Sequence, residues 1–303
     1  MGTIFATWKW GGSMSEMEKD IVTIKIIPEE KKGVEIGMSS IIGTRSNQED
    51  TIFGHEKDGE AVAVVCDGMG GLAGGELASK AAAQSLVEAW FGGEKVEDIP
   101  MFLEREAVRA DEKIFLQENE NGERIRAGTT IVAAIIRKNE LYWLSVGDSK
   151  IYIIRGEEIL SVCREHNYRL TLDQQLEAGE LTREEYAAEE YRAEALISYL
   201  GMGNVSLMDV NRRPFLLKEG DIVLLSSDGL YKSLAEEEIL SVLKENKKDM
   251  QAAAKALTTA ALGEKKSGQD NTSVVTLRYG GIQKKPNRKQ IRNGGLKDEF
   301  EKM

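Results

Sequence analysis

The chain has 303 residues, of which 41% are hydrophobic and 30% charged, and its formal net charge is −11. This balance is typical of a globular protein, and the length allows one large domain or two small ones with a sizeable core. The negative charge argues against a general nucleic-acid binder, because such binding depends on clustered positive charge.

Features of membrane and secreted proteins are missing from the sequence as well. No apolar run approaches the roughly 18 residues that a membrane span requires, and the first residues lack the sections of a signal peptide. Cys66 and Cys163 are the only cysteines, and neither has the spacing of a metal-ligand pair. We expect a cytoplasmic protein with no membrane span, whose cysteines are reduced and buried.

The two ends of the chain differ in composition from its middle. Residues 1–32 mix glycine, tryptophan and charge before a short alternating run at 21–27 that could be an added edge strand, and we assign this extension no chemistry. Residues 281–303 carry seven basic against three acidic side chains, and such a tail is more often disordered than a docking site. We expect one domain over residues 33–280.

Predicted strands and helices alternate in blocks from residue 33 onward. We expect strands at 35–42, 51–55 and 61–66, helices at 76–91 and 99–118, and four further strands at 129–137, 141–146, 150–155 and 158–162. The first helix follows from apolar residues three and four positions apart, such as Ala78, Ala81 and Ala82. The gaps between the four later strands are short and turn-like, which predicts hairpins and antiparallel pairing.

The segment 168–200 interrupts the strand series, because its pattern is charged and helical. Two more strands are expected at 207–217 and 221–226, helices within 235–245 and 248–262, and a closing strand at 272–279. Strands in hairpin series with helices grouped together indicate an α+β layered domain rather than a doubly wound one.

Two of the apolar strand-like runs lead into the same dipeptide. Residues 61–66 precede Asp67-Gly68 and residues 222–227 precede Asp228-Gly229, while a third acid, Asp270, comes just before the run 273–277. One such dipeptide is usually only a turn. Several carboxylates converging at strand ends would hold hard divalent cations such as Mg²⁺ or Mn²⁺, which prefer oxygen ligands.

The glycines after Asp67 also fit a different motif. Gly68, Gly70 and Ala73 match the spacing of a dinucleotide-binding fingerprint that follows a strand and opens a helix. That motif requires parallel βαβ units, which the expected hairpins contradict, and Asp67 would repel a pyrophosphate. We therefore favour Asp67 as a metal ligand, with Gly68 allowing the backbone carbonyl to approach an ion.

Further polar residues lie in loops between the predicted strands. Arg45, Glu49 and Asp50 precede the strand at 51–55, and Asp148 lies at a plausible hairpin tip. Alone, each would be a solvated loop or an ordinary turn. Beside the two Asp-Gly dipeptides, Arg45 becomes a planar donor for a phosphate and the acids become further metal or water partners.

The whole set resembles the protein phosphatase 2C family of metal-dependent serine/threonine phosphatases. The matching stretches occur in the family's order within about 37–278, and they are RSNQED at 45–50, VCDGMGG at 65–71, GTT at 128–130, SVGDS at 145–149, LSSDGL at 225–230 and GQDNT at 268–272. The resemblance implies a four-layer αββα sandwich, in which two antiparallel sheets are flanked by helices, with a mobile flap at about 168–200.

The same resemblance implies roles for the site residues. Asp67, Asp228 and Asp270 match the ligands of one metal ion, and Asp67 with the backbone carbonyl of Gly68 matches those of a second. The remaining matches are Glu49 and Asp50, which reach the second ion directly or through water, Asp148, which with Asp228 can hold a weaker third ion, and Arg45, the phosphate-binding arginine.

On this resemblance, we expect hydrolysis of phosphoserine and phosphothreonine in proteins by a hydroxide that bridges two Mn²⁺ or Mg²⁺ ions. The enzyme would oppose a Ser/Thr kinase, its partners would be phosphorylated proteins and that cognate kinase, and we expect a monomer. Two alternatives stay open, namely a dedicated phosphatase of one regulatory partner and an inactive family member that binds phosphoproteins. The complete set of acids argues against the inactive form.

The chain departs from the family pattern in three places. Met69 stands where many eukaryotic relatives have a histidine, which points to the bacterial type. Glu165 replaces the usual aspartate before His166, which we expect to be structural rather than catalytic. Residues 191–201 of the flap diverge as well, which leaves flap-dependent substrate choice and the behaviour of the third metal open.

Overall fold

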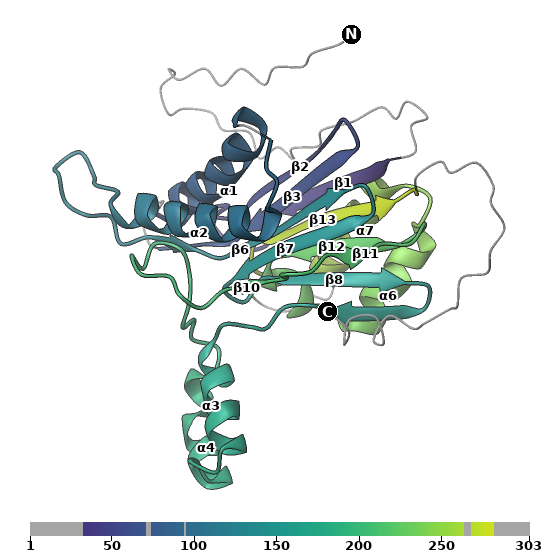
Figure 1. The fold of residues 1–303 in the computed structure, drawn as a ribbon. Coiled ribbons are helices and arrows are strands. Elements are labelled where there is room, and N and C mark those ends of the chain that lie inside the picture. The colour runs from purple at the N-terminus through teal and green to yellow at the C-terminus, as the bar shows by residue number, and fades with distance from the viewer. Residues whose placement is uncertain (1–32, 71–73, 94, 264–267, 282–303) are drawn as a thin grey trace.

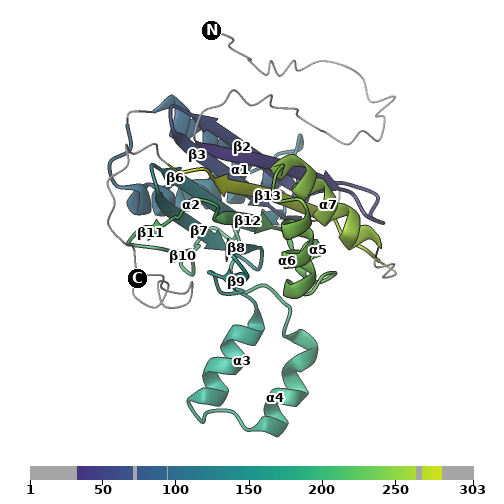
Figure 2. The same cartoon turned by 90° about the vertical axis from the view of Figure 1, so that its right-hand side faces the viewer.

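Two antiparallel sheets packed face to face form the centre of the computed structural model, which describes residues 33–70, 74–93, 95–263 and 268–281 (Figure 1 and Figure 2). The first sheet has the strand order β1 (Val34–Ile41), β13 (Thr272–Tyr279), β12 (Ile222–Ser226), β8 (Lys150–Arg155) and β9 (Glu158–Ser161). The second has the order β10 (Asp209–Val210), β7 (Glu140–Val146), β6 (Ile131–Arg137), β3 (Glu60–Cys66) and β2 (Thr51–Lys57), and β11 (Phe215–Leu216) also pairs with β7.

Helices cover both outer faces of the sandwich (Figure 1). The second sheet packs against α1 (Gly74–Gly92) and α2 (Ile99–Phe115), whereas the first packs against α5 (Asp228–Tyr231), α6 (Glu236–Glu245) and α7 (Met250–Gly263). The order of layers is therefore helices, sheet, sheet, helices. The expected α+β fold with two antiparallel sheets is confirmed.

Strand β3 shows why the apolar runs of this sequence become central strands. Its even-numbered side chains Val62, Val64 and Cys66 pack toward α1 and α2, and its odd-numbered ones pack between the two sheets. Because side chains alternate along a strand, a run that is buried on both faces must be apolar throughout. This burial holds the residue that follows, Asp67, at a fixed strand end.

The pairing of β3 excludes the dinucleotide-binding interpretation. Both neighbours of β3 in the sheet, β2 and β6, run antiparallel to it, so no parallel βαβ unit surrounds the glycines. The chain after Asp67 instead forms the short strand β4 (Gly68–Met69), which pairs with β5 (Gly128–Thr129). The strand β4 and the helix α5 were not predicted from the sequence, and the single strand expected at 129–137 is divided into β5 and β6.

The prediction of a single strand at 207–217 is wrong, because the structure has two short strands there. Both β10 and β11 pair with β7, and the chain between them leaves the sheet. The side chain of Asn211 accepts a hydrogen bond from the backbone N–H of Trp143 at 2.7 Å and donates to the carbonyl of Leu141 at 3.0 Å. Pro214 follows without an N–H for a ladder, so the amide of Asn211 replaces the backbone in this bend.

The flap, residues 168–200, projects from the body of the sandwich (Figure 1 and Figure 2). It consists of α3 (Tyr168–Glu177), α4 (Arg183–Glu189), the 3₁₀ helix η1 (Glu190–Arg192) and the chain that returns to the body. Thr182 and Glu185 form a capping box at the start of α4. The returning chain is tied to the sandwich by backbone hydrogen bonds in both directions between Leu200 and Thr129, of 2.9 and 3.0 Å.

Three other expectations concern the ends of the chain, its cysteines and membranes. The N-terminal extension 1–32 and, after residue 281, the basic tail lie outside the described residues, so the proposed domain limits stay a prediction. Both cysteines are free, Cys66 buried and Cys163 half-buried. Within the described part of the chain, no helix has the length and apolar character needed to cross a membrane.

Candidate active site

A cavity of about 530 Å³ lies where the sequence predicts the site. The strand pairing explains the position, because Thr51 pairs with Cys66 in one sheet, while Ile41 pairs with Thr272 in the other. The segments that follow β1, β3 and β12 and that precede β8 and β13 therefore meet at one end of the sandwich. Among the residues that line the cavity are Arg45, Glu49, Asp67, Asp148, Asp228 and Asp270.

Asp67 lies at the centre of the acidic side chains, at the end of β3. Its backbone N–H donates to Thr130 Oγ1 at 3.0 Å, and its carbonyl accepts from Thr129 Oγ1 at 2.9 Å. Burial raises the pKa of Asp67 well above its ordinary value, and the charges of Asp50 and Asp228 act in the same direction. The backbone of Asp67 is thus held firmly, while its carboxylate lies among like charges.

Gly68 is required by the close approach of three chain segments. A Cβ atom at this position would lie 2.2 Å from the carbonyl oxygen of Gly75 and 2.5 Å from that of Glu49. Real Cβ atoms do not come this near to backbone, so any other residue would push the segments apart. Gly68 therefore allows the chain to pass through this narrow space, where it lines the cavity next to Asp67.

Asp228 follows β12 and opens the short helix α5. Its Oδ2 accepts a hydrogen bond from Lys232 Nζ at 2.6 Å, whereas its Oδ1 is buried without a hydrogen-bond partner among the described residues. Gly229 is again forced by packing, because its Cβ would lie 2.2 Å from the carbonyl oxygen of Asn271. Lys232 also lines the cavity, and no sequence motif pointed to it.

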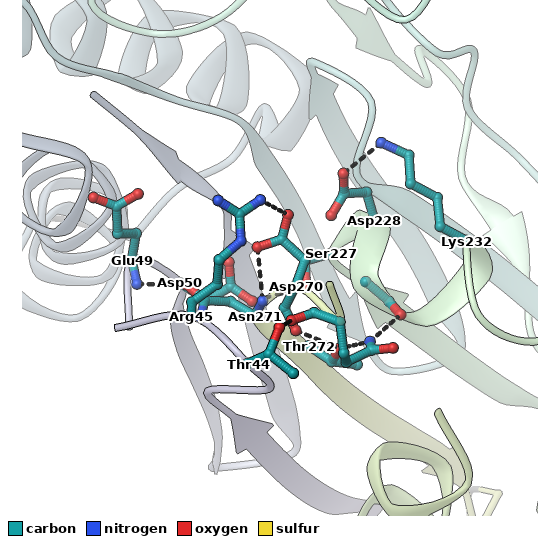
Figure 3. Close-up of polar contacts among 12 residues, drawn as sticks. Thr44, Arg45, Glu49, Asp50, Ser227, Asp228, Lys232, Asp270, Asn271 and Thr272 are labelled. Carbon is teal, nitrogen blue, oxygen red and sulfur yellow. Dashed lines mark hydrogen bonds and ion pairs between the residues drawn. The ribbon is translucent and has the colours of Figure 1, made fainter. Parts of the chain in front are cut away.

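Asp270 and Arg45 form an ion pair at the edge of the cavity, with 2.5 Å between Arg45 Nη2 and Asp270 Oδ2. In Figure 3 Arg45 and Lys232 reach the two carboxylates Asp270 and Asp228 from opposite sides. The hydrogen bond and the charge of Asp270 raise the pKa of Arg45 further. The Arg45 side chain is 59% exposed, so it can change partner without losing buried surface.

Asp148 is buried at the tip between β7 and β8, only 6% exposed. Burial raises its pKa to about 6, and the charge of Asp228 adds to the increase while Lys232 opposes it. The adjoining Gly147, at φ +102°, is held on both sides by His166, whose N–H donates to the Gly147 carbonyl at 2.9 Å and whose Nδ1 accepts from the Gly147 N–H at 3.2 Å. This geometry supports the structural role expected for His166.

Glu49 and Asp50 take different positions although they are adjacent. Glu49 lines the cavity, and burial raises its pKa. Asp50 is buried behind the cavity wall, where its Oδ2 accepts from Ser227 Oγ at 2.8 Å and its Oδ1 has no hydrogen-bond partner among the described residues. Burial raises the pKa of Asp50 to about 7. Of the predicted site residues, Asp50 is the one that does not line the cavity.

Asn271 holds the loop of Arg45 and Glu49 in place, a role that sequence reasoning missed. Its Oδ1 accepts from the N–H of Glu49 at 2.8 Å, and its Nδ2 donates to the carbonyls of Ile42 at 2.9 Å and Asn47 at 3.0 Å. Thr130 holds the backbone of Asp67 in a similar way, because its Oγ1 accepts a hydrogen bond from the Asp67 N–H. Both residues lie within stretches that resemble the family, so the motifs contained them without revealing their function.

The residues of this site fit a hard divalent cation in their chemistry. Within the described ranges, no three acidic, histidine or cysteine side chains are arranged as a ready-made metal group, and Arg45 and Lys232 pair with two of the carboxylates. Yet the donors are almost all carboxylate oxygens, which Mg²⁺ and Mn²⁺ prefer. Two buried oxygens, on Asp50 and Asp228, lack a hydrogen-bond partner among the described residues, as expected where a cation completes the site.

Comparison with solved structures defines the class of the protein. A serine/threonine phosphatase from S. agalactiae has the same fold, with a TM-score of 0.69 and 29% identity over 81% of this chain and 99% of the other. The catalytic domain of the serine/threonine protein phosphatase PstP in complex with two manganese ions has a TM-score of 0.64 and 26% identity over 81% of this chain and 97% of the other. The fold is therefore that of metal-dependent protein phosphatases.

The family follows from the sequence comparisons. The family model for protein phosphatase 2C matches residues 36–264, so this chain belongs to the protein phosphatase 2C family. It is 29% identical to the serine/threonine phosphatase stp of Listeria welshimeri over 75% of this chain and 88% of the relative, and 28% identical to the protein phosphatase PhpP of Streptococcus pneumoniae over 80% and 97%. The predicted bacterial-type family and the enzyme class, protein serine/threonine phosphatase, are confirmed.

Proposed function

We propose that this protein hydrolyses phosphoserine and phosphothreonine in other proteins with the help of two Mn²⁺ or Mg²⁺ ions, and that it opposes a Ser/Thr kinase. One observation carries the proposal: Asp67, Asp148, Asp228 and Asp270 come from four separate segments and line one cavity with Arg45 at its edge. The serine/threonine phosphatases named above and the manganese-bound relative support it.

The ions would be held by the residues expected from the sequence. Asp67, Asp228 and Asp270 would bind one ion, and Asp67 with the Gly68 carbonyl would bind the other. Glu49 would reach the second ion directly or through water, and Asp50 would act from behind the wall through water. We propose that Asp148 and Asp228 form the place of a weaker third ion, because both line the cavity and the charge of Asp228 adds to the increase that burial causes in the pKa of Asp148.

Bound divalent ions would supply hydroxide at neutral pH by lowering the pKa of a water molecule that they share. The protein's own part is to position the phosphoryl group and to neutralise its charge. The Arg45 guanidinium matches two phosphoryl oxygens in geometry, and its exposure allows it to exchange Asp270 for the substrate. Neutralising the equatorial oxygens in this way stabilises the transition state of phosphoryl transfer.

Histidine acid catalysis is not part of this proposal. The chain has two histidines, His55 and His166, and neither lines the cavity. His166 is fully buried and its Nδ1 accepts a hydrogen bond from Gly147. Met69, at the position where a histidine would be expected in many eukaryotic relatives, does line the cavity but has no proton to donate.

Turnover of a phosphothreonine peptide tests the proposal. The purified protein should release phosphate with Mn²⁺, lose this activity in EDTA and regain it when Mn²⁺ is restored. Asp228→Asn should lower kcat by about 10²-fold or more at saturating Mn²⁺, since it removes a charged ligand. Asp58→Asn, the same chemical change in the exposed turn between β2 and β3, is the matched control and should leave kcat unchanged.

The results also separate the two alternatives. Full activity of Asp228→Asn would contradict the ligand assignment. Tight binding of phosphopeptide without turnover under any metal would favour the inactive binding module, and turnover of one phosphoprotein but of no peptide would favour a dedicated phosphatase. We also propose that the protein acts as a monomer in the cytoplasm, which sedimentation velocity and cell fractionation would check.

A further inference from the structure

Lys232 brings a positive charge to two of the cavity aspartates. Its Nζ lies 2.6 Å from Asp228 Oδ2 and 4.0 Å from Asp148 Oδ2, and Figure 3 shows the side chain extended toward Asp228. Burial alone would lower the pKa of Lys232, but the charge and hydrogen bond of Asp228 outweigh it, and the pKa is raised. The ammonium group therefore stays charged where cations are expected to bind.

A nearby positive charge stabilises the two aspartates next to Lys232, whether it comes from a lysine or from a metal ion. Their side chains are 8% and 14% exposed, for Asp148 and Asp228 respectively. Lys232 approaches both side chains, so the two carboxylates lie near each other and repel when both are charged. Lys232 is covalently fixed one helical turn after Asp228, and its N–H donates to the Asp228 carbonyl at 3.0 Å, so its ammonium cannot move far away.

The two carboxylate oxygens of Asp228 have different surroundings. Oδ2 accepts from Lys232, on the side of Asp148, whereas Oδ1 is buried without a hydrogen-bond partner among the described residues. Asp228 can thus offer Oδ1 to an ion shared with Asp67 and Asp270 while it keeps Lys232 on Oδ2. Arg45 differs, because it pairs with Asp270 on the other side and is more exposed, 59% against 44%.

We propose that Lys232 is the tethered cation of the Asp148–Asp228 pair and competes there with a further divalent ion. The inference rests on the proposed function, since it assumes that ions bind to the other carboxylates of the cavity. A lysine ammonium is a compact point charge and suits a site for a spherical cation better than the planar guanidinium of arginine does. This chain would accordingly bind its weakest divalent ion less tightly than its four aspartates would allow.

Mn²⁺ binding without substrate tests the role of Lys232. The free Mn²⁺ signal in electron paramagnetic resonance gives the number and affinity of bound ions for the wild type and for Lys232→Met, which removes the charge and keeps the apolar stem. We expect the weakest ion to bind at least about fivefold more tightly in Lys232→Met, because one positive charge a few ångströms away is lost and solvent screens part of its effect. Lys232→Arg keeps the positive charge, so it should gain less affinity for this ion than Lys232→Met does.

Two further variants show whether the change in Mn²⁺ affinity depends on the Asp148–Asp228 pair. Lys244→Met removes one positive charge from α6, where Lys244 pairs with Glu157 outside the cavity lining, and it should leave the isotherm unchanged. Adding Asp148→Asn to Lys232→Met should abolish the gain in affinity.

Identical isotherms for the wild type and Lys232→Met would overturn the role of Lys232 alone, as would a gain that persists in the double variant. If neither protein bound Mn²⁺, the proposed function would fail together with this inference.

Discussion

Two strands of the sandwich lead into the same dipeptide, Asp-Gly, one after β3 and the other after β12. The two glycines serve the same purpose, because a Cβ on either would lie 2.2 Å from a carbonyl oxygen, that of Gly75 for Gly68 and that of Asn271 for Gly229. The backbone is packed equally tightly in both places. What differs is the surroundings of the carboxylates.

Asp67 lies among like charges, whereas Asp228 has its own cation. Burial and the charges of other carboxylates raise the pKa of Asp67, while Lys232 donates to Asp228 at 2.6 Å. Identical local sequence therefore gives the same backbone geometry but different electrostatics, because the neighbours that set the charge come from other parts of the chain. We therefore expect Asp67 to depend more on bound cations than Asp228 does.

The largest expected effect is that of Asp67→Asn. It should lower kcat by roughly 10³-fold, or ~4 kcal/mol, in the Mn²⁺-dependent assay. In EDTA the same change should raise the Tm by roughly 2–4 °C, as expected for about 1 kcal/mol in a domain of this size, because it removes a buried charge that only like charges surround. Differential scanning calorimetry in EDTA and in Mn²⁺ measures the Tm of the metal-free and the metal-bound protein.

Asp228→Asn is the matched comparison for this stability effect. It removes a charge that Lys232 already balances, so its Tm in EDTA should stay the same or fall. Equal rises for the two variants would show that Lys232 does not distinguish the two aspartates. A fall for Asp67→Asn would contradict the description of its surroundings as repulsive.

Replacing either glycine should cost about the same stability. Gly68→Ala and Gly229→Ala each place a methyl group against a backbone carbonyl, which does not move as a flexible side chain would, so we expect a loss of roughly 2–3 kcal/mol. Gly92→Ala is the control, because nothing lies within 4 Å of its Cβ. Urea denaturation of the three variants in EDTA would show the difference, and a cost below that of Gly92→Ala at either site would be inconsistent with the packing.

The sequence predicted the parts of the molecule that depend on local pattern. The continuous apolar run of β3, the hairpin gaps between the later strands and the helical spacing in α1 all follow from short-range rules. The acids at the strand ends were found because they lie next to such runs, and the structure brings Asp67, Asp148, Asp228 and Asp270 to one cavity. Their roles as ligands stay a prediction.

Contacts between distant segments could not be predicted in this way. Asp111 of α2 is buried and accepts hydrogen bonds from the N–H groups of Gly201, Gly203 and Val205, so it anchors the chain that leaves the flap. Nothing near Asp111 in the sequence indicates this partner about 90 residues later. The same holds for Asn271, whose amide bonds to Ile42 at a separation of 229 residues.

A third aspartate of the cavity, Asp148, should make the stability of the protein depend on pH. Its folded pKa is raised from 3.8 to about 6, so between these values the folded state binds more protons than the unfolded state. Its contribution to stability is therefore full below pH 3.8 and is lost as the pH rises through 6. The change amounts to about 1 kcal/mol between pH 5 and 7.

Thermal melts in EDTA at pH 5, 6 and 7 should show a weaker pH dependence for Asp148→Asn than for the wild type, because the variant has no proton to lose. Asp50, with a pKa raised to about 7 by burial, adds a dependence of the same sign in both proteins. If the Tm of Asp148→Asn changed with pH as steeply as that of the wild type, the carboxyl group of Asp148 would not titrate in this range.

The smallest effect should come from the hydroxyl that holds the backbone of Asp67. Thr130→Val leaves the Asp67 N–H without the acceptor that it has at 3.0 Å, and Ser149 Oγ without its partner at 2.7 Å, which should cost about 1 kcal/mol. Thr258→Val removes a buried hydroxyl that bonds to Ser39 Oγ at 2.8 Å, on α7 and outside the cavity lining, and should cost a similar amount. Only Thr130→Val should raise the Mn²⁺ concentration for half-maximal activity, by about threefold, since a looser Asp67 binds ions less well. Equal metal dependence in the two variants would mean that the Thr130 hydroxyl is not needed to hold the backbone around Asp67.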